Sequence, residues 1–198
     1  MAEKGARSAD ERMRVMARIG VIAAGYAVAT LFALLFLGSL AWGPVQFRVS
    51  EALCVLAIAV PEARWGLALG CALANCANVF LGGTGVLGML DVVFGSLATF
   101  LGAVISWRLR DRPRLAVLGP VVANALIVPA YLPLMLSGLG FYTIPFTSVS
   151  LEGAWTLMYL FGLVATGLGE AVVMYALGLP LYNVLASRSP LLRDANGD

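Results

Sequence analysis

Long apolar stretches, separated by short polar, glycine-containing or proline-containing segments, occupy most of this chain. A helix that crosses a bilayer needs about 20 largely apolar residues, and six stretches reach or approach that length. We place them at residues 17–40, 47–60, 63–81, 90–107, 115–137 and 152–186. The pattern predicts an all-α membrane protein, a bundle of six transmembrane helices.

Glycine and proline mark where these helices should turn, bend or end. Pro44 disfavours helical geometry at Gly43, which predicts a turn there. Prolines 120, 129 and 133 predict kinks in the fifth helix. The last apolar stretch is longer than a bilayer requires, so we expect a tilt or a break near residues 178–180.

Composition agrees with a lipid environment. The 198 residues are 61% hydrophobic and 12% charged, whereas soluble domains average about 45–50% apolar and about 25% charged residues. The first apolar run exceeds the core of a secretory signal, so we interpret it as a retained helix. We expect one six-helix domain over residues 17–187, with polar tails at 1–16 and 188–198.

The basic residues are distributed unevenly between the predicted loops. With both termini in the cytoplasm, twelve of the thirteen lie on the cytoplasmic side and only Arg48 lies outside, as the positive-inside rule requires. The twelve are Lys4, Arg7, Arg12, Arg14, Arg18, Arg64, Arg108, Arg110, Arg112, Arg114, Arg188 and Arg193. An odd number of helices would break this pattern. We therefore expect a multi-pass protein of a bacterial cytoplasmic membrane.

Four of the polar residues within the apolar segments are candidates for a binding site, since an ionisable group at membrane depth costs roughly 2.5–3.5 kcal/mol. Glu170 lies midway along the last stretch, and its carboxylate suits a ligand amine or cation better than a purely structural role. Asn75 and Asn78 share one face of the third helix, and Asn124 lies on the fifth. Hydrogen bonding between helices is an equally good interpretation of the asparagines. We nevertheless predict that all four residues line a binding pocket.

Three charged residues fall at the predicted outer boundary. Arg48 and Glu51, three residues apart, either neutralise one another or contact a ligand near the pocket mouth. Asp91 opens the fourth predicted helix, where a carboxylate also suits the free amide groups and the helix dipole. We place Arg48, Glu51 and Asp91 near the outer mouth of the pocket.

Several classes of chemistry are disfavoured. The absence of histidine argues against zinc hydrolases and histidine-dependent triads, and no phosphate-binding P-loop motif occurs, so we predict no catalysis, metal or cofactor in this chain. Residues 83–88 match GxGxxG without a surrounding βαβ unit, and we interpret them as an outer loop. The cysteines at 54, 71 and 76 are interpreted as small packing residues.

The first helix carries small residues at close spacing, namely Gly20, Ala23, Ala24 and Ala27. Small residues three or four apart let helices approach closely in lipid. They serve either packing within this bundle or docking against a second membrane subunit.

Five segments in order resemble the QueT family, namely GPVQFRVSEAL (43–53), GCALANC (70–76), LDVVFGSLATFLGA (90–103), GPVVANALIV (119–128) and GLGEAVVMYALGLPL (167–181). The resemblance covers roughly residues 15–186. It implies a substrate-binding S component of an energy-coupling factor (ECF) transporter, an importer of the ABC type that takes up queuosine precursors. These are 7-deazaguanines, such as the aminomethyl or cyano form or queuine.

The resemblance also implies partners. A transmembrane scaffold subunit and two ATPase subunits would dock on this chain, and ATP would be hydrolysed only in those partners. The family's first helix carries an AxxxA docking pattern, which Gly20 and Ala24 match with glycine in the first position, while Ala23 and Ala27 offer a neighbouring register. Two alternatives remain open, an S component for another vitamin-like solute and, from another class, an intramembrane enzyme.

Overall fold

The computed structural model describes residues 2–41, 43–81, 85–136, 141–144 and 147–188. Most of the described chain is helical, and its only β-type pairing is an isolated bridge between Thr143 and Ser150. Four of its helical stretches are long and apolar enough to cross a membrane, at Ala9–Leu37, Gly85–Arg108, Pro113–Leu136 and Trp155–Arg188. The all-helical class is confirmed, whereas the count of six spans stays a prediction.

The first third of the chain contains one long helix and several short ones. Helix α1 (Ala2–Leu37) is followed by the 3₁₀ turn η1 (Gly38–Ala41), and η2 (Val49–Val55) continues into α2 (Leu56–Ala59). The predicted second span is therefore an apolar helix of 11 residues, Val49–Ala59, which is too short to cross a bilayer alone. Pro61 lies just beyond its end, and α3 (Ala63–Leu81) follows.

The remaining helices contain two π-helical turns. The 3₁₀ turn η3 (Gly85–Gly88) leads through the π turn η4 (Asp91–Gly95) into α4 (Ser96–Arg108), and α5 (Pro113–Ala116) precedes α6 (Leu118–Leu136). Helix α7 (Trp155–Val173) passes through the π turn η5 (Met174–Gly178) into α8 (Leu179–Arg188). Near residues 178–180, where we expect a tilt or a break, the helix continues without a break, and the tilt stays a prediction. Pro180 has no N–H to donate to the helix, and the wider π turn η5, which ends two residues before it, accommodates the missing hydrogen bond.

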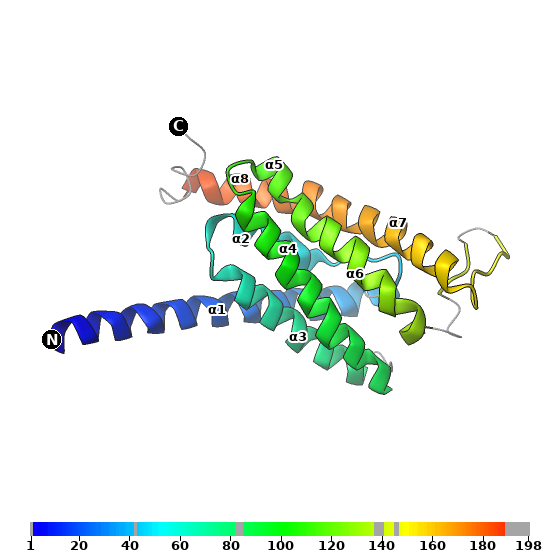
Figure 1. Ribbon diagram of the computed structural model, residues 1–198, viewed down its shortest axis with the longest axis horizontal. Coiled ribbons are helices and arrows are strands. Elements are labelled where there is room, and N and C mark those ends of the chain that lie inside the picture. The colour runs from blue at the N-terminus through cyan, green and yellow to red at the C-terminus, as the bar shows by residue number, and fades with distance from the viewer. Residues whose placement is uncertain (1, 42, 82–84, 137–140, 145–146, 189–198) are drawn as a thin grey trace.

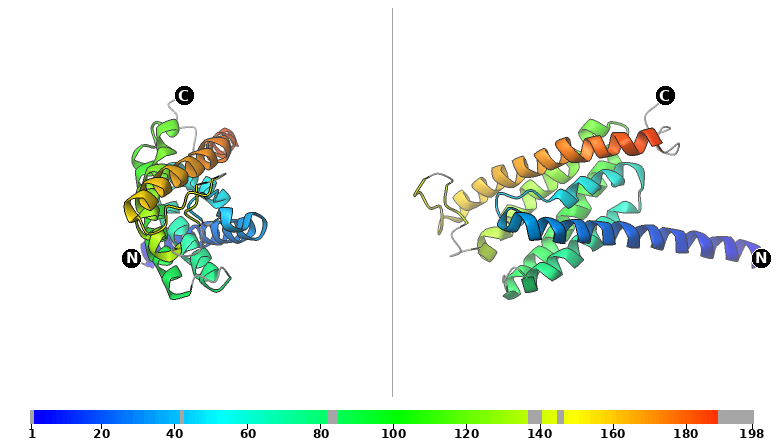
Figure 2. Two further views of the ribbon diagram at one scale, coloured as in Figure 1. Left: turned by 90° about the vertical axis from the view of Figure 1, so that its right-hand side faces the viewer. Right: turned by 180° about the vertical axis from the view of Figure 1, so that it is seen from behind.

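The helices lie side by side in a continuous series (Figure 1). Helix α1 packs against α3, α3 against α4, α4 against α6 and α6 against α7, while η2 and η5 meet between them. The N-terminal end of α1 and the C-terminal end of α8 lie at the same end of the bundle, and α1 projects beyond its neighbours (Figures 1 and 2). Both ends of the described helical region therefore face the same side.

Glycine allows two of these helix pairs to approach closely. A Cβ atom at Gly70 of α3 would lie 2.6 Å from the carbonyl oxygen of Ala23 in α1. A Cβ at Gly119 of α6 would lie 2.5 Å from the carbonyl oxygen of Gly102 in α4. Small residues at such contacts are typical of helices packed in lipid.

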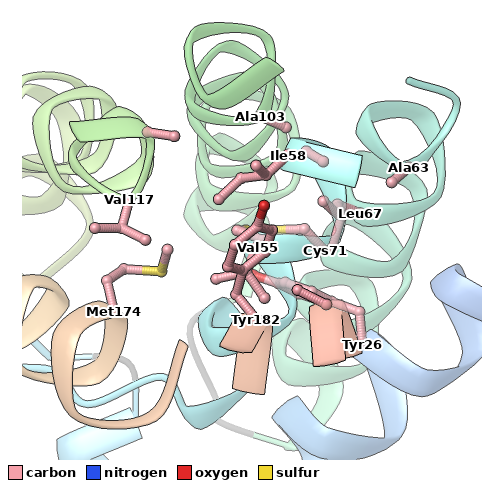
Figure 3. Close-up of a cluster of buried hydrophobic side chains, with 14 residues drawn as sticks. Tyr26, Val55, Ile58, Ala63, Leu67, Cys71, Ala103, Val117, Met174 and Tyr182 are labelled. Carbon is pink, nitrogen blue, oxygen red and sulfur yellow. The ribbon is translucent and has the colours of Figure 1, made fainter. Parts of the chain in front are cut away.

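A buried apolar cluster joins the two halves of the bundle (Figure 3). Tyr26 of α1, Leu67 of α3, Val55 of η2, Met174 of η5 and Tyr182 of α8 converge there, all at most 2% exposed. Large apolar side chains also cover the outside of the helices, including Leu35, Phe80, Leu126, Leu168 and Val172. An apolar exterior around a partly polar interior suits a protein surrounded by lipid.

Candidate functional site

Four charged side chains are buried inside the apolar bundle. Arg48 is 6% exposed, Glu51 0%, Asp91 3% and Glu170 3%. They come from four different segments, namely the strand-like stretch before η2, η2 itself, η4 and α7. Burying a charge is costly unless it is paired and hydrogen-bonded. The hydrogen-bond and ion-pair partners of these four side chains therefore define the site.

Arg48 forms an ion pair with Asp91. Its Nη2 lies 3.0 Å from Asp91 Oδ2, and both side chains are less than a tenth exposed. The Nε group of Arg48 also donates to the carbonyl oxygen of Ala41 at 3.4 Å. This ion pair links the segment just before η2 to the π turn η4, which continues into α4.

Asp91 has a second set of contacts. The hydroxyl of Tyr131 in α6 donates to Asp91 Oδ1 at 2.6 Å, and Asn75 Nδ2 donates to the backbone carbonyl of Asp91 at 2.8 Å. A Cβ at Gly95, one helical turn further on, would lie 2.7 Å from Asp91 Oδ1. The π turn η4 thus places this carboxylate among α3, α6 and Arg48.

Glu51 is held by neutral donors. Tyr26 donates its hydroxyl to Glu51 Oε1, to which Thr99 also donates at 3.4 Å. The thiol of Cys54 donates to Oε2 at 3.0 Å. Both carboxylate oxygens of Glu51 therefore have partners, and none of the described cationic side chains forms an ion pair with it.

Glu170 is the least satisfied of the charged groups. The Asn124 side chain lies close enough to act on its carboxylate, whereas Glu170 Oε1 has no hydrogen-bond partner among the described residues. Glu51 and Arg48 are near enough to act on Glu170 electrostatically, the first repelling its charge and the second attracting it. The three carboxylates and the single guanidinium thus belong to one buried cluster.

Four further oxygen atoms are buried without a partner in the described part of the chain, namely the amide oxygens Asn78 Oδ1 and Gln46 Oε1 and the hydroxyl oxygens of Ser96 and Tyr142. Asn78 lies 8% exposed on α3, and Gln46 lies 4% exposed in the segment leading to η2. Together with Glu170 Oε1, the two amide oxygens make three buried atoms that can only accept a hydrogen bond. Unpaired buried acceptors are unusual in folded proteins and often coincide with functional sites.

The segment 43–48 lies against α7 near Glu170. The Thr166 hydroxyl donates to the carbonyl of Pro44 at 3.0 Å, and Gly169 touches the backbone carbonyl of Gln46. No side chain fits at position 169, because even a Cβ would overlap that carbonyl. Gln46 is thereby held beside Glu170.

A narrow cavity opens between α1, α3 and Arg48. Its polar lining consists of Thr30, Arg48, Asn75 and Asn78. The cavity has a volume of about 10 Å³, roughly the minimum that holds one water molecule.

Within the described residues, no group of three or more acidic, cysteine or histidine side chains could hold a metal ion, and Cys54, Cys71 and Cys76 are free thiols.

The structure brings the predicted pocket residues into the interior, with several corrections. Arg48 pairs with Asp91 and not with Glu51. Asp91 cannot cap a helix start, because the helix already begins at Gly85. Arg48, Glu51 and Asp91 are buried within the bundle, as is Glu170, and their position near the outer mouth of the pocket stays a prediction. Of residues 83–88, the structure describes 85–88, which form a 3₁₀ turn instead of a loop.

Tyr131 and Thr99 escaped the sequence analysis. Both carry hydroxyl groups within apolar helices, a weak signal, since such groups also bond to their own backbone. The single hydroxyl proton of Thr99 is indeed shared between the carbonyl of Gly95 at 3.2 Å and Glu51 at 3.4 Å. Only the arrangement of helices shows that these hydroxyls reach Asp91 and Glu51.

The small residues of α1 divide between two faces. Ala23 is 2% exposed and packs against α3, and Ala27 is partly buried. Gly20 and Ala24 are exposed, and nothing lies within 4 Å of a Cβ added at Gly20. The register formed by Gly20 and Ala24 is therefore the one open to another helix.

Four membrane-length apolar helices surrounding a buried charged cluster define an integral membrane protein with a polar site in its interior. A family model described as QueT transporter matches residues 16–187, which include every residue of that cluster. The chain belongs to the QueT transporter family, a family of transporters and not of enzymes. Comparisons with curated proteins and with solved structures gave no significant match.

Proposed function

We propose that this protein is the substrate-binding S component of an ECF-type ABC importer and that its ligand is a queuosine precursor, a 7-deazaguanine. The site residues would be Glu170, Asn75, Asn78, Asn124, Arg48, Glu51 and Asp91, to which the structure adds Gln46. Membership of a transporter family supports a solute-binding role. The ligand class follows from the resemblance and from the chemistry of the site.

The proposal rests on one observation: the interior holds more hydrogen-bond acceptor atoms than the described residues supply donors for. Glu170 Oε1, Asn78 Oδ1 and Gln46 Oε1 lack donors among the described residues. The cluster also contains three carboxylates, at positions 51, 91 and 170, against one guanidinium, at position 48. A ligand rich in N–H groups, and optionally cationic, would complement both features.

A deazaguanine offers such groups. Its 2-amino-pyrimidine edge presents several N–H donors, and its aminomethyl form adds an ammonium group. Glu170 would accept from this edge, and the asparagine and glutamine side chains would complete its hydrogen bonding. Asn75, whose amide already bonds to Asp91, would position Asp91 and thereby Arg48.

The proposal includes a topology and partners. The bundle would have six membrane helices, with α2 and its preceding 3₁₀ turn as a short second one and both termini in the cytoplasm of a bacterium. The exposed register of Gly20 and Ala24 would dock on a transmembrane scaffold subunit served by two ATPase subunits. The common orientation of the two helical ends supports the placement of both termini on one side of the membrane, and the positive-inside rule favours the cytoplasm as that side.

Ligand binding to the purified full-length protein tests the proposal. Isothermal titration with the aminomethyl and cyano deazaguanines and queuine should reveal binding by at least one of them. Thiamine, riboflavin and biotin serve as comparison ligands. Binding of one of these vitamins, with no response to any deazaguanine, would replace the proposed ligand by another vitamin-like solute.

Glu170→Gln provides the residue-level test. Loss of its charge should weaken binding of the deazaguanine by at least tenfold, because charge-assisted hydrogen bonds are about twice as strong as neutral ones. Glu62→Gln is the matched control, since Glu62 pairs with the exposed Arg18 away from the cluster. Equal affinity in the Glu170 variant and the wild type would assign Glu170 a structural role.

A further inference from the structure

A second polar site lies at the end of the bundle where α1 begins and α8 ends. Its basic rim comes from the turn between α4 and α5, and its floor from α8, which lies beside α5 in Figure 1. Arg112, Pro113 and Arg114 line one wall of a cleft of about 380 Å³, and Leu179, Tyr182 and Asn183 line the other. The volume lies within the range of about 300–1,000 Å³ typical of small-ligand sites.

Charge around this cleft is strongly one-sided. Residues 108–114 hold four arginines and one aspartate, Asp111, so the turn carries three more positive than negative charges. None of these arginines forms an ion pair within the described chain, where the two observed pairs are Arg18–Glu62 and Arg48–Asp91. Arg112 and Arg114 are both exposed. The cleft therefore offers uncompensated guanidinium groups to an anion.

The cleft is also fixed in shape and only partly polar. The Tyr175 hydroxyl donates to the carbonyl of Arg114 at 2.9 Å, which ties the basic turn to the helix opposite. Leu179 and the buried ring of Tyr182 form an apolar floor beneath the arginines. Nearby, the Arg110 guanidinium lies 4.4 Å from the centre of the Trp107 ring, an amphipathic pairing typical of membrane boundaries.

We infer that this cleft binds the phosphate headgroup of an anionic phospholipid, with Arg112 and Arg114 contacting the phosphate and Leu179 and Tyr182 contacting the first part of an acyl chain. A guanidinium presents paired N–H donors that match phosphate oxygens. Basic pockets between membrane helices on the cytoplasmic side are suited to such headgroups. The apolar floor favours a lipid over free phosphate. The inference needs a membrane placement but is independent of the transported solute.

Native mass spectrometry of the full-length protein in detergent tests this inference. Phosphatidylglycerol is titrated against phosphatidylcholine with the same acyl chains, and sn-glycerol 3-phosphate represents the headgroup without chains. We expect preferential binding of phosphatidylglycerol. Since each basic residue contributes about 1 kcal/mol to anionic-lipid attraction, the Arg112→Gln/Arg114→Gln variant should lose about 25-fold in affinity.

Two further variants make the result specific. Arg12→Gln/Arg14→Gln removes the same charge from the exposed start of α1 and should leave lipid affinity unchanged. Arg112→Lys/Arg114→Lys keeps the charge but loses the paired N–H donors, so it should bind phosphatidylglycerol with an affinity between those of the wild type and the glutamine variant, which keeps the test available if the glutamine variant folds poorly. Unchanged affinity in the glutamine variant, an equal loss in the α1 control, or equally tight binding of glycerol phosphate would each overturn the proposed lipid site.

Discussion

The guanidinium of Arg48 and the carboxylate of Asp91 form a buried ion pair at 3.0 Å across 43 residues of sequence. Tyr131 fixes the same carboxylate from a third segment. This pair therefore connects the segment entering η2, the π turn η4 and helix α6. Removing one buried partner leaves the other charge unpaired, which typically costs about 3–5 kcal/mol.

A double-mutant cycle should reveal this coupling. Arg48→Gln and Asp91→Asn should each lower the melting temperature of the detergent-solubilised protein substantially. The double variant should lose less stability than the sum of the two, because no isolated buried charge remains. Additive losses would show that the two side chains contribute independently.

The hydroxyl of Tyr131 should matter more for stability than that of a second buried tyrosine. Tyr131→Phe removes the bond to Asp91 and should cost about 1–3 kcal/mol. Tyr142 is equally buried, but its hydroxyl has no partner in the described chain, so Tyr142→Phe is the matched control. Thermal unfolding should show a loss for Tyr131→Phe and little change for Tyr142→Phe. A similar effect of both substitutions would contradict the assigned role of Tyr131.

Gly169 should tolerate no side chain. In Gly169→Ala the new Cβ would overlap the carbonyl of Gln46, so the segment 43–48 must move away from α7. We expect lower thermal stability and, if Gln46 contacts the ligand, weaker binding of the deazaguanine. Gly25→Ala is the control, because nothing lies within 4 Å of its added Cβ. Unchanged stability and affinity in Gly169→Ala would show that the segment moves freely.

Two neighbouring alanines on α1 should respond differently to enlargement. Ala23→Leu introduces a large side chain into the close contact with α3 and should lower the yield of folded protein. Position 24 lies on the exposed face, so in Ala24→Leu ligand binding should survive while uptake by the proposed importer, whose scaffold subunit would dock there, fails. Uptake into cells and binding to the purified protein measure the two effects. Normal uptake by Ala24→Leu would exclude this register as the docking surface.

Sequence reasoning identified the residues of the buried cluster better than their contacts. A charged or amide side chain in an apolar helix is rare because of its energetic cost. The positions of Glu170, Asn75, Asn78 and Asn124 within apolar segments were therefore enough to single them out. Spacing three residues apart suggested that Arg48 pairs with Glu51. The 3₁₀ geometry of η2 and the position of η4 instead bring Arg48 to Asp91.

Helix boundaries were predictable only where the pattern changed sharply. The start of α3 after Pro61 and the end of α4 near Arg108 agree with the sequence, since proline and a run of charge mark them. The π turns η4 and η5 have no comparable signal in hydropathy. They made Asp91 an internal helix residue and removed the expected break at residues 178–180.

By itself, the sequence determined that the chain is a helical membrane protein and that a few polar residues in its interior are exceptional. Hydropathy and burial cost are local properties of a segment, so they can be read without knowing its neighbours. The tertiary structure decided which of those residues meet. Pairings such as Arg48 with Asp91 and Tyr131 with Asp91 join distant segments, and they depend on how the helices pack, a property that no single segment contains.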